Sequence, residues 1–561
     1  MPRPGSRLDS RNAALALLGL AMAVSVVVVL YAGRGRTFGS DELVYATRLS
    51  QQSLWHAMFH PPSNSYLIAL PMAVYRALYE TVGMTSYVPY RLLAMALNLL
   101  CAGLFYALAR RRIGDLWALA PTTLLLFFGF GSEEILTFQR MPGSIALAAG
   151  LGMLLVLSRG TRGADIAAAI LLTVSVLSHP LGLAFVAAAA VMVLSRPPAV
   201  RWRSCWIVAV PALAFAVWWL FVRADATVPM QSDPGEIASF VRQSWTATVE
   251  AVSGVAGVVS DPIYDASLGW IVSALVLALI AVVVARRVRR PTPTFWAAAA
   301  ALLTLMIMTG ITRGTEFLMH GRPADAGRYL YPQAFLLLLV LVELAGVARP
   351  PNWVKAATVV VLGLGLIANL DELDQAGRAG RALAPQLRTG YGAIEGGEES
   401  VNRDYFPNGY LFPDAGDYFD FSHAFGSFAF SAEKLQSAPI PRRVRADQVL
   451  VAGLGIVARR APAGPAGRCI VLRPPVEATL VVRPGTLFLK GENLRNARLR
   501  IGRFNQDPTV PVRVPAAGRS LRLPIPAIDT PLQWRLAVAS PSPVSVCGAT
   551  RPSPVRTRGG S

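Results

Sequence analysis

The sequence is poor in charged residues, and one residue type supplies almost all of its positive charge. Only 15% of the 561 residues are charged, whereas 53% are hydrophobic, and the mean hydropathy is +0.45. Soluble domains carry nearer a quarter charged residues, so this composition is typical of an integral membrane protein. Lysine occurs only at Lys355, Lys434 and Lys490, so arginine accounts for most of the net charge of +20.

Several motifs that would indicate other classes of protein are also missing. The sequence has no Walker or GxGxxG motif, which argues against a nucleotide-activated substrate, and its five histidines and four cysteines show no zinc-type spacing. The apolar run 13–32 is too long for a cleavable signal peptide and lacks a clear small-residue cleavage site, so we expect an uncleaved first span. The arginines sit in short clusters between apolar runs, which favours membrane topology over nucleic-acid binding.

Eleven apolar runs are predicted to cross the membrane. They are 12–32, 88–109, 116–131, 140–158, 164–178, 180–195, 205–223, 268–285, 295–311, 329–348 and 354–370. With eleven spans, the basic connections all fall on the same side as the N-terminus. These connections are "ARRR" (109–112), "SRGTRG" (158–163), "SRPPAVRWR" (195–203), "ARRVRR" (285–290) and "ARPPNWVK" (348–355). The positive-inside rule makes that side cytoplasmic and puts everything after residue 371 outside the cytoplasm.

The first outer loop, 33–87, has helical spacing of apolar residues over 41–59 and 64–80. We expect two helices that lie along the membrane interface, with Tyr75 among their aromatic anchors.

The chain changes character after the membrane region, which is taken as 1–370. A linker at 371–400 leads to a domain at 401–555 made of short alternating runs, the first of which is "DQVLVAGLGIVARR". Such runs, separated by Pro, Gly, Asn and Asp, are typical of an antiparallel β-sandwich. A disulfide between Cys469 and Cys547 of this domain is permitted in an oxidising compartment.

Acidic, basic and imidazole side chains gather in the connections assigned to the outer face. The candidate site residues among them are Asp41, Glu42, His60, Glu133, Glu134, Arg140, His179, Arg322 and Arg328. Arginines that converge from several connections suit a phosphate-bearing lipid, and a carboxylate suits proton transfer.

The carboxylates also have structural interpretations. After Ser40 as N-cap, Asp41 and Glu42 would occupy the first turn of a helix, where acidic groups favour the helix dipole. Glu133 and Glu134 could simply end a span in the headgroup region, or contact an acceptor or a metal.

The basic candidates have alternatives too. Arg140 and Arg328 could be snorkelling anchors at the starts of spans. His179, before Pro180, could face the site or be a hydrogen-bonded histidine that closes a turn. His60 could shape the loop or contact an acceptor or a metal.

Four stretches together resemble a known family. They are "DELVYA" after the first span, "HPPSNSYLIALPMAVYRAL" in the first loop, "YRLLAMALNLLCAGLFYALARRRIG" in the second span and "GRYLYPQAFLLLLV" in a late span. In this order they resemble the GT-C superfamily of polyprenyl-phosphate-sugar-dependent glycosyltransferases, in its protein O-mannosyltransferase and aminoarabinose transferase branch. The resemblance covers roughly residues 12–370. Relatives often carry a lysine near the position of His179.

The resemblance implies a polytopic α-helical membrane protein of GT-C-like fold, here joined to a C-terminal extracytoplasmic β-sandwich. It also implies a lipid-phosphate sugar donor and inversion at the anomeric carbon. The catalytic acidic residue of the family corresponds to Asp41, with Glu42 beside it. Glu42 would orient an acceptor hydroxyl or act on Asp41 through like-charge proximity.

We therefore expect an inverting glycosyltransferase of a bacterial plasma membrane. It would move a sugar from a polyprenyl-phosphate donor to a cell-envelope acceptor, with Arg140, Arg322, Arg328 and His179 on the donor phosphate. No cofactor is required, although carboxylates of the site could hold a divalent cation, and no nucleic-acid partner is expected. The alternatives are a transporter or flippase of lipid-linked sugars and a non-catalytic scaffold that binds the cell wall.

Overall fold

A computed structural model of the chain divides into two compact units, each described here by itself. Unit 1 comprises 1–39, 52–81 and 87–381, and unit 2 comprises 40–51, 82–86 and 382–561. The structure describes residues 4–60, 66–222, 231–254, 267–287, 291–320, 324–348, 351–461, 469–474, 476–515, 519–529 and 532–552.

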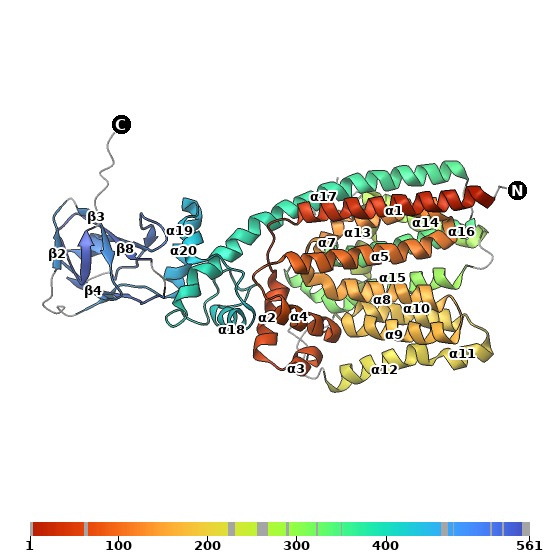
Figure 1. Cartoon of the computed structure of the whole chain (residues 1–561), viewed down its shortest axis with the longest axis horizontal. Helices are drawn as coiled ribbons and strands as arrows, with labels where there is room; N and C mark the ends of the chain where they lie inside the picture. The colour runs from red at the N-terminus through yellow and green to blue at the C-terminus, as the bar shows by residue number, and fades with distance from the viewer. Residues whose placement is uncertain are drawn as a thin grey trace. The chain divides into compact units, whose positions relative to one another are not determined.

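Unit 1 is helical (Figure 1). Its helices are α1 (Pro4–Ala32), α3 (Leu54–Phe59), α4 (Ala69–Thr81), α5 (Val88–Ile113), α6 (Asp115–Leu126), α7 (Ser132–Leu136), α8 (Met141–Leu157), α9 (Arg162–Ser178), α10 (Leu181–Leu194), α11 (Pro198–Ser204), α12 (Trp206–Phe221), α13 (Pro234–Ser253), α14 (Ser267–Arg287), α15 (Pro293–His320), α16 (Gly327–Ala348) and most of α17 (Asn352–Ile394). Short 3-10 turns, η1 (Gly129–Gly131) and η2 (Phe138–Arg140), flank α7.

Each of the eleven predicted spans contains a helix, but fewer helices meet the requirements of a membrane span. Among the described residues, seven helices are long and apolar enough to cross a membrane, or eight if the bent pair of α6 and η1–α7 counts as one. Helix α10 and most of α14 are shorter apolar helices. The structure therefore indicates a multi-pass membrane protein, and the number eleven stays a prediction.

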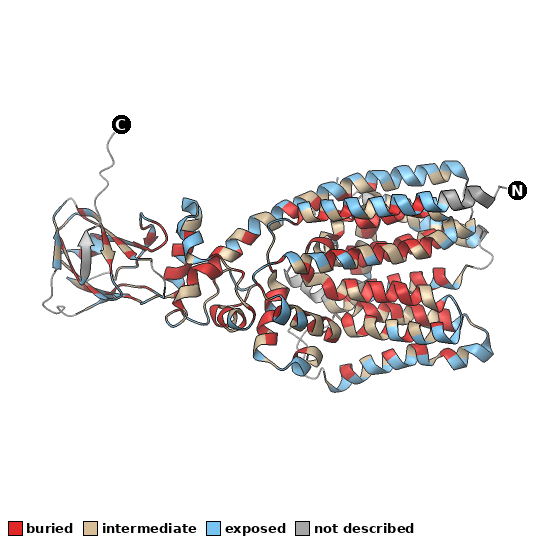
Figure 2. Ribbon diagram, in the orientation of Figure 1, coloured by how far each residue is buried: buried red, intermediate tan, exposed pale blue. Residues whose placement is uncertain are grey.

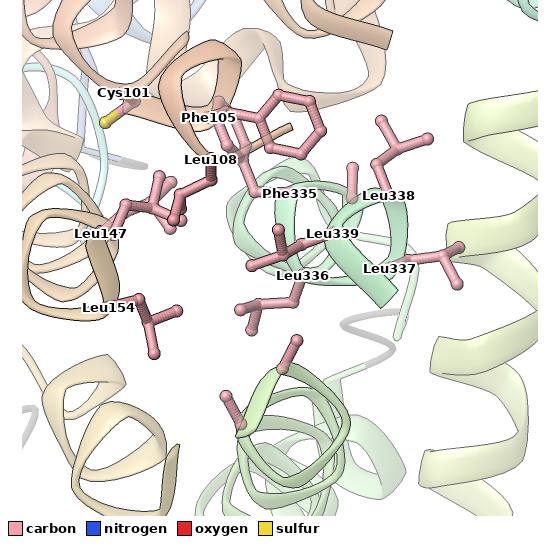
Figure 3. Packing of buried hydrophobic residues seen from close by; sticks show 14 of the residues in the cluster. Cys101, Phe105, Leu108, Leu147, Leu154, Phe335, Leu336, Leu337, Leu338 and Leu339 are labelled. Atoms are coloured by element: carbon pink, nitrogen blue, oxygen red, sulfur yellow. The ribbon is translucent and has the colours of Figure 1, made fainter. Parts of the chain in front are cut away.

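The centre of unit 1 is formed by α5, α8 and α16. Figure 3 shows Leu147 of α8 and Leu336 of α16 on facing helices, with Phe105 of α5 beside them. The rings of Phe105 and Phe335 meet edge to face, 5.9 Å apart. In contrast, α1, α12 and α17 expose many of their apolar side chains (Figure 2), which is the pattern expected of helices that face lipid.

Arginines hold the end of α1 against α5 and α17. Arg91 of α5 donates to the Leu30 carbonyl at 2.7 Å, and Arg381 of α17 donates to the Ala32 carbonyl at 2.9 Å. These carbonyls belong to the last turn of α1, which lacks helical donors and favours cations. The segment that leaves α1 is thus fixed where it starts.

Close packing at Gly377 of α17 gives a testable consequence for stability. A Cβ at this position would lie 2.7 Å from the Ala32 carbonyl oxygen, whereas a Cβ at Gly363 of the same helix would meet nothing within 4 Å. Gly377→Ala is expected to lower the unfolding free energy by about 1–3 kcal/mol, because the backbone of α1 would have to shift. Gly363→Ala is the matched control and should be neutral or stabilising. Thermal unfolding of the purified chain in detergent measures both, and equal melting temperatures would contradict the packing.

Unit 2 contains helices as well as strands. Its helices are α2 (Ser40–Gln51), the end of α17, α18 (Ala415–Phe425), α19 (Ala432–Gln436) and α20 (Ile440–Gly453). The prediction of a strand for the first alternating run, 447–460, is wrong for its first half, which lies in α20. Ala446, Val449, Leu450 and Gly453 are buried at helical spacing. The predicted linker is also largely helical, since α17 continues to Ile394.

Ten strands of the described part of unit 2 form two antiparallel sheets. They are β1 (Arg459–Arg460), β2 (Cys469–Leu472), β3 (Val476–Val482), β4 (Gly485–Gly491), β5 (Arg498–Gly502), β6 (Val510–Pro511), β7 (Ser520–Ile525), β8 (Trp534–Ser540), β9 (Val544–Cys547) and β10 (Ala549–Pro552). One sheet has the order β1-β7-β4-β9-β2 and the other β10-β3-β8-β5-β6. In β8, Trp534, Leu536 and Val538 are buried while Arg535 and Ala537 are only half-buried, as a sheet with one buried face requires.

A buried carboxylate joins α20 to the strands. Asp447 accepts hydrogen bonds from the backbone N–H groups of Arg503 at 2.6 Å, Phe504 at 2.8 Å and Asn505 at 3.0 Å. These three donors follow β5 directly, so the helix and the sheet are tied together within unit 2.

A disulfide joins Cys469 and Cys547, which lie opposite each other on β2 and β9. Because it closes a loop of 78 residues, its loss is expected to cost roughly 2–4 kcal/mol of the unfolding free energy of unit 2. Unfolding of the Cys469→Ser variant in detergent tests this, with Cys205→Ser, at a free cysteine of unit 1, as the control. Unchanged stability of Cys469→Ser would show that the bridge adds nothing.

Candidate functional site

A break between two apolar helices of unit 1 carries several of the predicted site residues. The chain bends by 45° between α6 and the η1–α7 segment, and then passes through α7 and η2 before α8 begins at Met141. Pro142 favours this helix start, because a missing N–H is tolerated in the first turn. Glu133, Glu134 and Arg140 are thus held together between two long helices.

Two arginines converge on one carboxylate oxygen of Glu133. Arg140 Nε lies 3.4 Å from Glu133 Oε2, and Arg328 Nη1, from the first turn of α16, lies 3.6 Å from the same atom. The two arginine side chains are 17% and 21% exposed and that of Glu133 35%, so the group is sheltered but open to solvent. Two guanidinium groups that share one carboxylate leave positive charge available for a second anion. We call Glu133, Arg140 and Arg328 the Glu133 cluster.

Glu134 makes a different set of contacts from Glu133. Its side chain is buried, with an exposure of 5%, and Ser144 Oγ of α8 donates a hydrogen bond to Glu134 Oε2 at 2.9 Å. Its carboxyl group lies beside Gly143, in the first turn of α8. This geometry supports a structural role, so contact between Glu134 and an acceptor or metal stays a prediction without support from the contacts.

Aromatic side chains fix the position of the chain just before Arg140. Tyr87 Oη accepts from the Phe138 N–H at 2.8 Å, and Tyr75 Oη donates to the Phe138 carbonyl at 3.0 Å. The Phe138 and Tyr90 rings are 5.3 Å apart, and the Tyr90 and Phe38 rings 5.0 Å. Tyr75 is fully buried, so its predicted role as an interfacial anchor is wrong. Phe38 and Phe138 therefore belong to one aromatic cluster of unit 1.

The acidic pair of the first loop lies in unit 2. Asp41 and Glu42 occupy the first turn of α2, as the helix-start interpretation predicts. Glu42 is fully buried, whereas Asp41 is half-buried and is therefore the one of the two that a ligand can reach.

The far end of α2 is anchored within unit 2. Gln51 Nε2 donates to Asp417 Oδ1 and Asp420 Oδ2 of α18, both at 3.0 Å. The pKa of the Asp417 carboxyl is raised above its usual value, mainly because burial disfavours the charged form.

The remaining candidates make contacts that fit structural roles or lie outside the described residues. The His179 ring meets the Tyr66 ring of the first loop edge to face, with centroids 5.5 Å apart. His179 ends α9, and its Nδ1 accepts from the Leu181 N–H at 3.2 Å, which fits the turn-closing interpretation. His60 ends α3 and stacks on His56 with ring centroids 3.9 Å apart, which fits a loop-shaping role. Arg322 lies outside the described residues. Within the described ranges, no three His, Cys, Asp or Glu side chains gather as a metal site.

Comparison with known proteins finds similarity at the level of structure only. No protein-family model matches the sequence, and no curated protein matches it. The chain is similar to ArnT from Cupriavidus metallidurans bound to undecaprenyl phosphate, with 16% identity over 70% of this chain and 82% of that chain and a TM-score of 0.41. It is similar to the Archaeoglobus fulgidus oligosaccharyltransferase tethered with an acceptor peptide, with 14% identity over 74% of this chain and 59% of that chain and a TM-score of 0.41. It is also similar to the arabinosyltransferase EmbB from Mycobacterium smegmatis, with 15% identity over 96% of this chain and 64% of that chain and a TM-score of 0.33.

All three are membrane glycosyltransferases of the GT-C superfamily, which is the superfamily that the four sequence stretches resemble. Because every TM-score is below 0.5, these similarities assign neither a substrate nor the role of any residue in this chain.

Proposed function

We propose that the chain is an inverting glycosyltransferase that moves a sugar from a polyprenyl-phosphate donor to an acceptor hydroxyl of the cell envelope. The observation that carries this proposal is the Glu133 cluster, in which Arg140 and Arg328 share a single carboxylate at the end of membrane helices. A lipid phosphate reaches such a position from the bilayer, and arginine forks match its oxygens.

The phosphate is the leaving group in the proposed reaction. Attack by the acceptor oxygen forms a bond to the anomeric carbon, while the bond from that carbon to the phosphate oxygen breaks and its electron pair moves onto the phosphate. Arg140 and Arg328, with Arg322 and His179 as further predicted contacts, stabilise the charge that grows there. The leaving phosphate is already anionic and needs no strong general acid.

Asp41 is the proposed general base. It takes the proton that the acceptor hydroxyl loses, and its partial exposure allows this contact. Glu42 is fully buried, which favours action on Asp41 through its charge over contact with the acceptor.

The ends of α8 differ in a way that supports the proposed topology. The Glu133 cluster lies at its start, whereas at its other end Arg111 donates to Ser158 at 2.9 Å. Nearby, Arg196 makes two hydrogen bonds with Asp165, at 2.8 and 2.9 Å. We assign the arginine-rich end to the cytoplasm of a bacterium and the Glu133 cluster to the outer face of its plasma membrane. The Cys469–Cys547 disulfide supports an oxidising compartment for unit 2. We infer that its two sheets form a sandwich that holds the acceptor.

Reconstituted liposomes separate this function from its rivals. The purified chain is supplied with a polyprenyl-phosphate sugar and envelope acceptors, and the lipid products are separated chromatographically. A transferase converts the donor to free polyprenyl phosphate only when an acceptor is present. A flippase moves the donor across the bilayer intact, and a scaffold does neither, so an intact donor would refute the proposal.

A further inference from the structure

Three cationic side chains of unit 2 surround one aromatic ring. The Phe430 ring centroid lies 4.4 Å from Arg388 Cζ, 4.9 Å from Lys434 Nζ and 5.3 Å from Arg442 Cζ. These cations come from the last part of α17, from α19 and from the first turn of α20, so three helices contribute to one place (Figure 1). We call these four residues the Phe430 cluster.

The ring is held rigidly. The Phe430 N–H donates to the Arg388 carbonyl at 3.0 Å, and Arg388 Nε donates to the Phe428 carbonyl at 2.8 Å. A Cβ at Gly392 would collide with the Phe430 carbonyl oxygen, so this segment lies directly against α17. Phe430 itself is buried, while Lys434 is exposed and the two arginines are half-buried. The three cations therefore surround a fixed, buried ring and are themselves accessible to solvent.

No carboxylate of the described chain neutralises these charges. None of the ion pairs formed by described residues includes Arg388, Lys434 or Arg442. Nor do the Lys434 and Arg442 side chains donate a hydrogen bond to any described residue. The Asp447 carboxylate, on the same helix as Arg442, is occupied by the backbone N–H groups that follow β5. An aromatic face attracts one cation well, but three like charges within about 10 Å repel one another unless an anion is bound.

We propose that the Phe430 cluster binds a phosphate group. Phosphate carries several acceptor oxygens, so it can bridge two guanidinium forks and an ammonium group at once. The phosphate comes either from a phospholipid headgroup or from soluble phosphate. Ile440, which is 59% exposed two residues before Arg442, suits the lipid source. This site is separate from the Glu133 cluster, and its existence does not depend on the transfer reaction.

The scarcity of lysine makes a direct test practical. Lys434 is one of only three lysines, so mass spectrometry can follow its acylation by an amine-reactive ester, with Lys490 of β4 as an internal control. The full chain is labelled in neutral detergent with inorganic phosphate or with sodium chloride of equal ionic strength. A second arm compares nanodiscs of zwitterionic lipid with nanodiscs that contain phosphatidylglycerol.

Bound phosphate should protect Lys434 and leave Lys490 unchanged. At a ligand concentration about tenfold above Kd, the free sites and hence the acylation rate fall roughly tenfold. Arg442→Gln should abolish the protection. Arg459→Gln, which removes an exposed arginine of β1, should not. Protection only in the anionic nanodiscs identifies a lipid headgroup, and protection by inorganic phosphate as well identifies soluble phosphate. Equal Lys434 rates in all conditions, or protection that survives Arg442→Gln, would overturn the proposal.

Discussion

Asp41→Asn is expected to lower the rate of sugar transfer by roughly 10²–10⁴-fold, the usual contribution of a general base. Asparagine keeps the size of the side chain and its place in the first turn of α2 but cannot accept the proton of the acceptor hydroxyl. Because the Glu133 cluster is unchanged, binding of the polyprenyl-phosphate donor should persist. Transfer rates at saturating donor, measured together with donor binding, distinguish loss of chemistry from loss of affinity.

The control for this variant is Asp404→Asn, which removes an exposed carboxylate from a loop of unit 2. It should transfer sugar at the rate of the unmodified chain. Comparable losses in the two variants, or full activity of a folded Asp41→Asn protein, would show that Asp41 is not the base and that the acidic pair serves only the helix start.

Arg140→Gln and Glu133→Gln are expected to change donor affinity in opposite directions. Arg140 is one of two guanidinium groups that share Glu133 Oε2. If it binds the donor phosphate, its loss removes a charged hydrogen bond worth about 1.5–3 kcal/mol, or roughly 10- to 100-fold in Kd. Glu133 competes with the phosphate for the same arginines, so Glu133→Gln should leave the affinity equal or higher. Binding of polyprenyl phosphate to the purified chain measures both.

Arg110→Gln is the matched control for this pair of variants. Arg110 also forms an ion pair, at 3.6 Å to Asp115, and its side chain is 31% exposed. Arg110 lies in the last turn of α5. Tyr87, at the start of the same helix, bonds Phe138 of η2, the segment that carries Arg140. Arg110 is therefore at the end of α5 that is remote from the Glu133 cluster. A similar loss of affinity in Arg110→Gln and Arg140→Gln would indicate a general charge effect, and weaker binding by Glu133→Gln would contradict the competition.

Most apolar helices of unit 1 could be predicted because apolar runs of about 20 residues have few alternatives in a membrane protein. Helix α13 was missed, because Pro234–Ser253 lies in none of the eleven predicted runs. The ends of helices were harder to predict. The first loop forms α2, α3 and α4 where two helices were expected, since Ser53 caps a new helix after a short break. The continuation of α17 to Ile394 was missed because its polar turns carry no span signal.

The strand error at α20 has a physical cause. The run from Val449 to Val451 is apolar and has a β-branched valine at each end, which favours a strand locally. The helix forms because Ala446 and Gly453 extend the buried face at helical spacing and Asp447 finds its donors after β5. Such long-range contacts cannot be deduced from a short window.

The candidate site was predictable in part. Arg140 and Arg328 stand out because arginines on the outer face are unusual, and Glu133 is a candidate for acceptor or metal contact. The structure brings these three residues together. Ser144 and Tyr87 were missed, because their roles depend on packing among α5, α7 and α8. The spacing of Tyr87 from Phe138 along the chain contains no signal for that contact.

The most direct test of the central claim is the stoichiometry and stereochemistry of a single turnover. The purified chain is mixed with a polyprenyl-phosphate sugar of known anomeric configuration and an envelope acceptor, and the products are identified by mass spectrometry and NMR. The account predicts one free polyprenyl phosphate for each new glycosidic bond, with the anomeric configuration inverted. A product that retains the donor configuration, or a donor that stays uncleaved in the presence of acceptor, would contradict it.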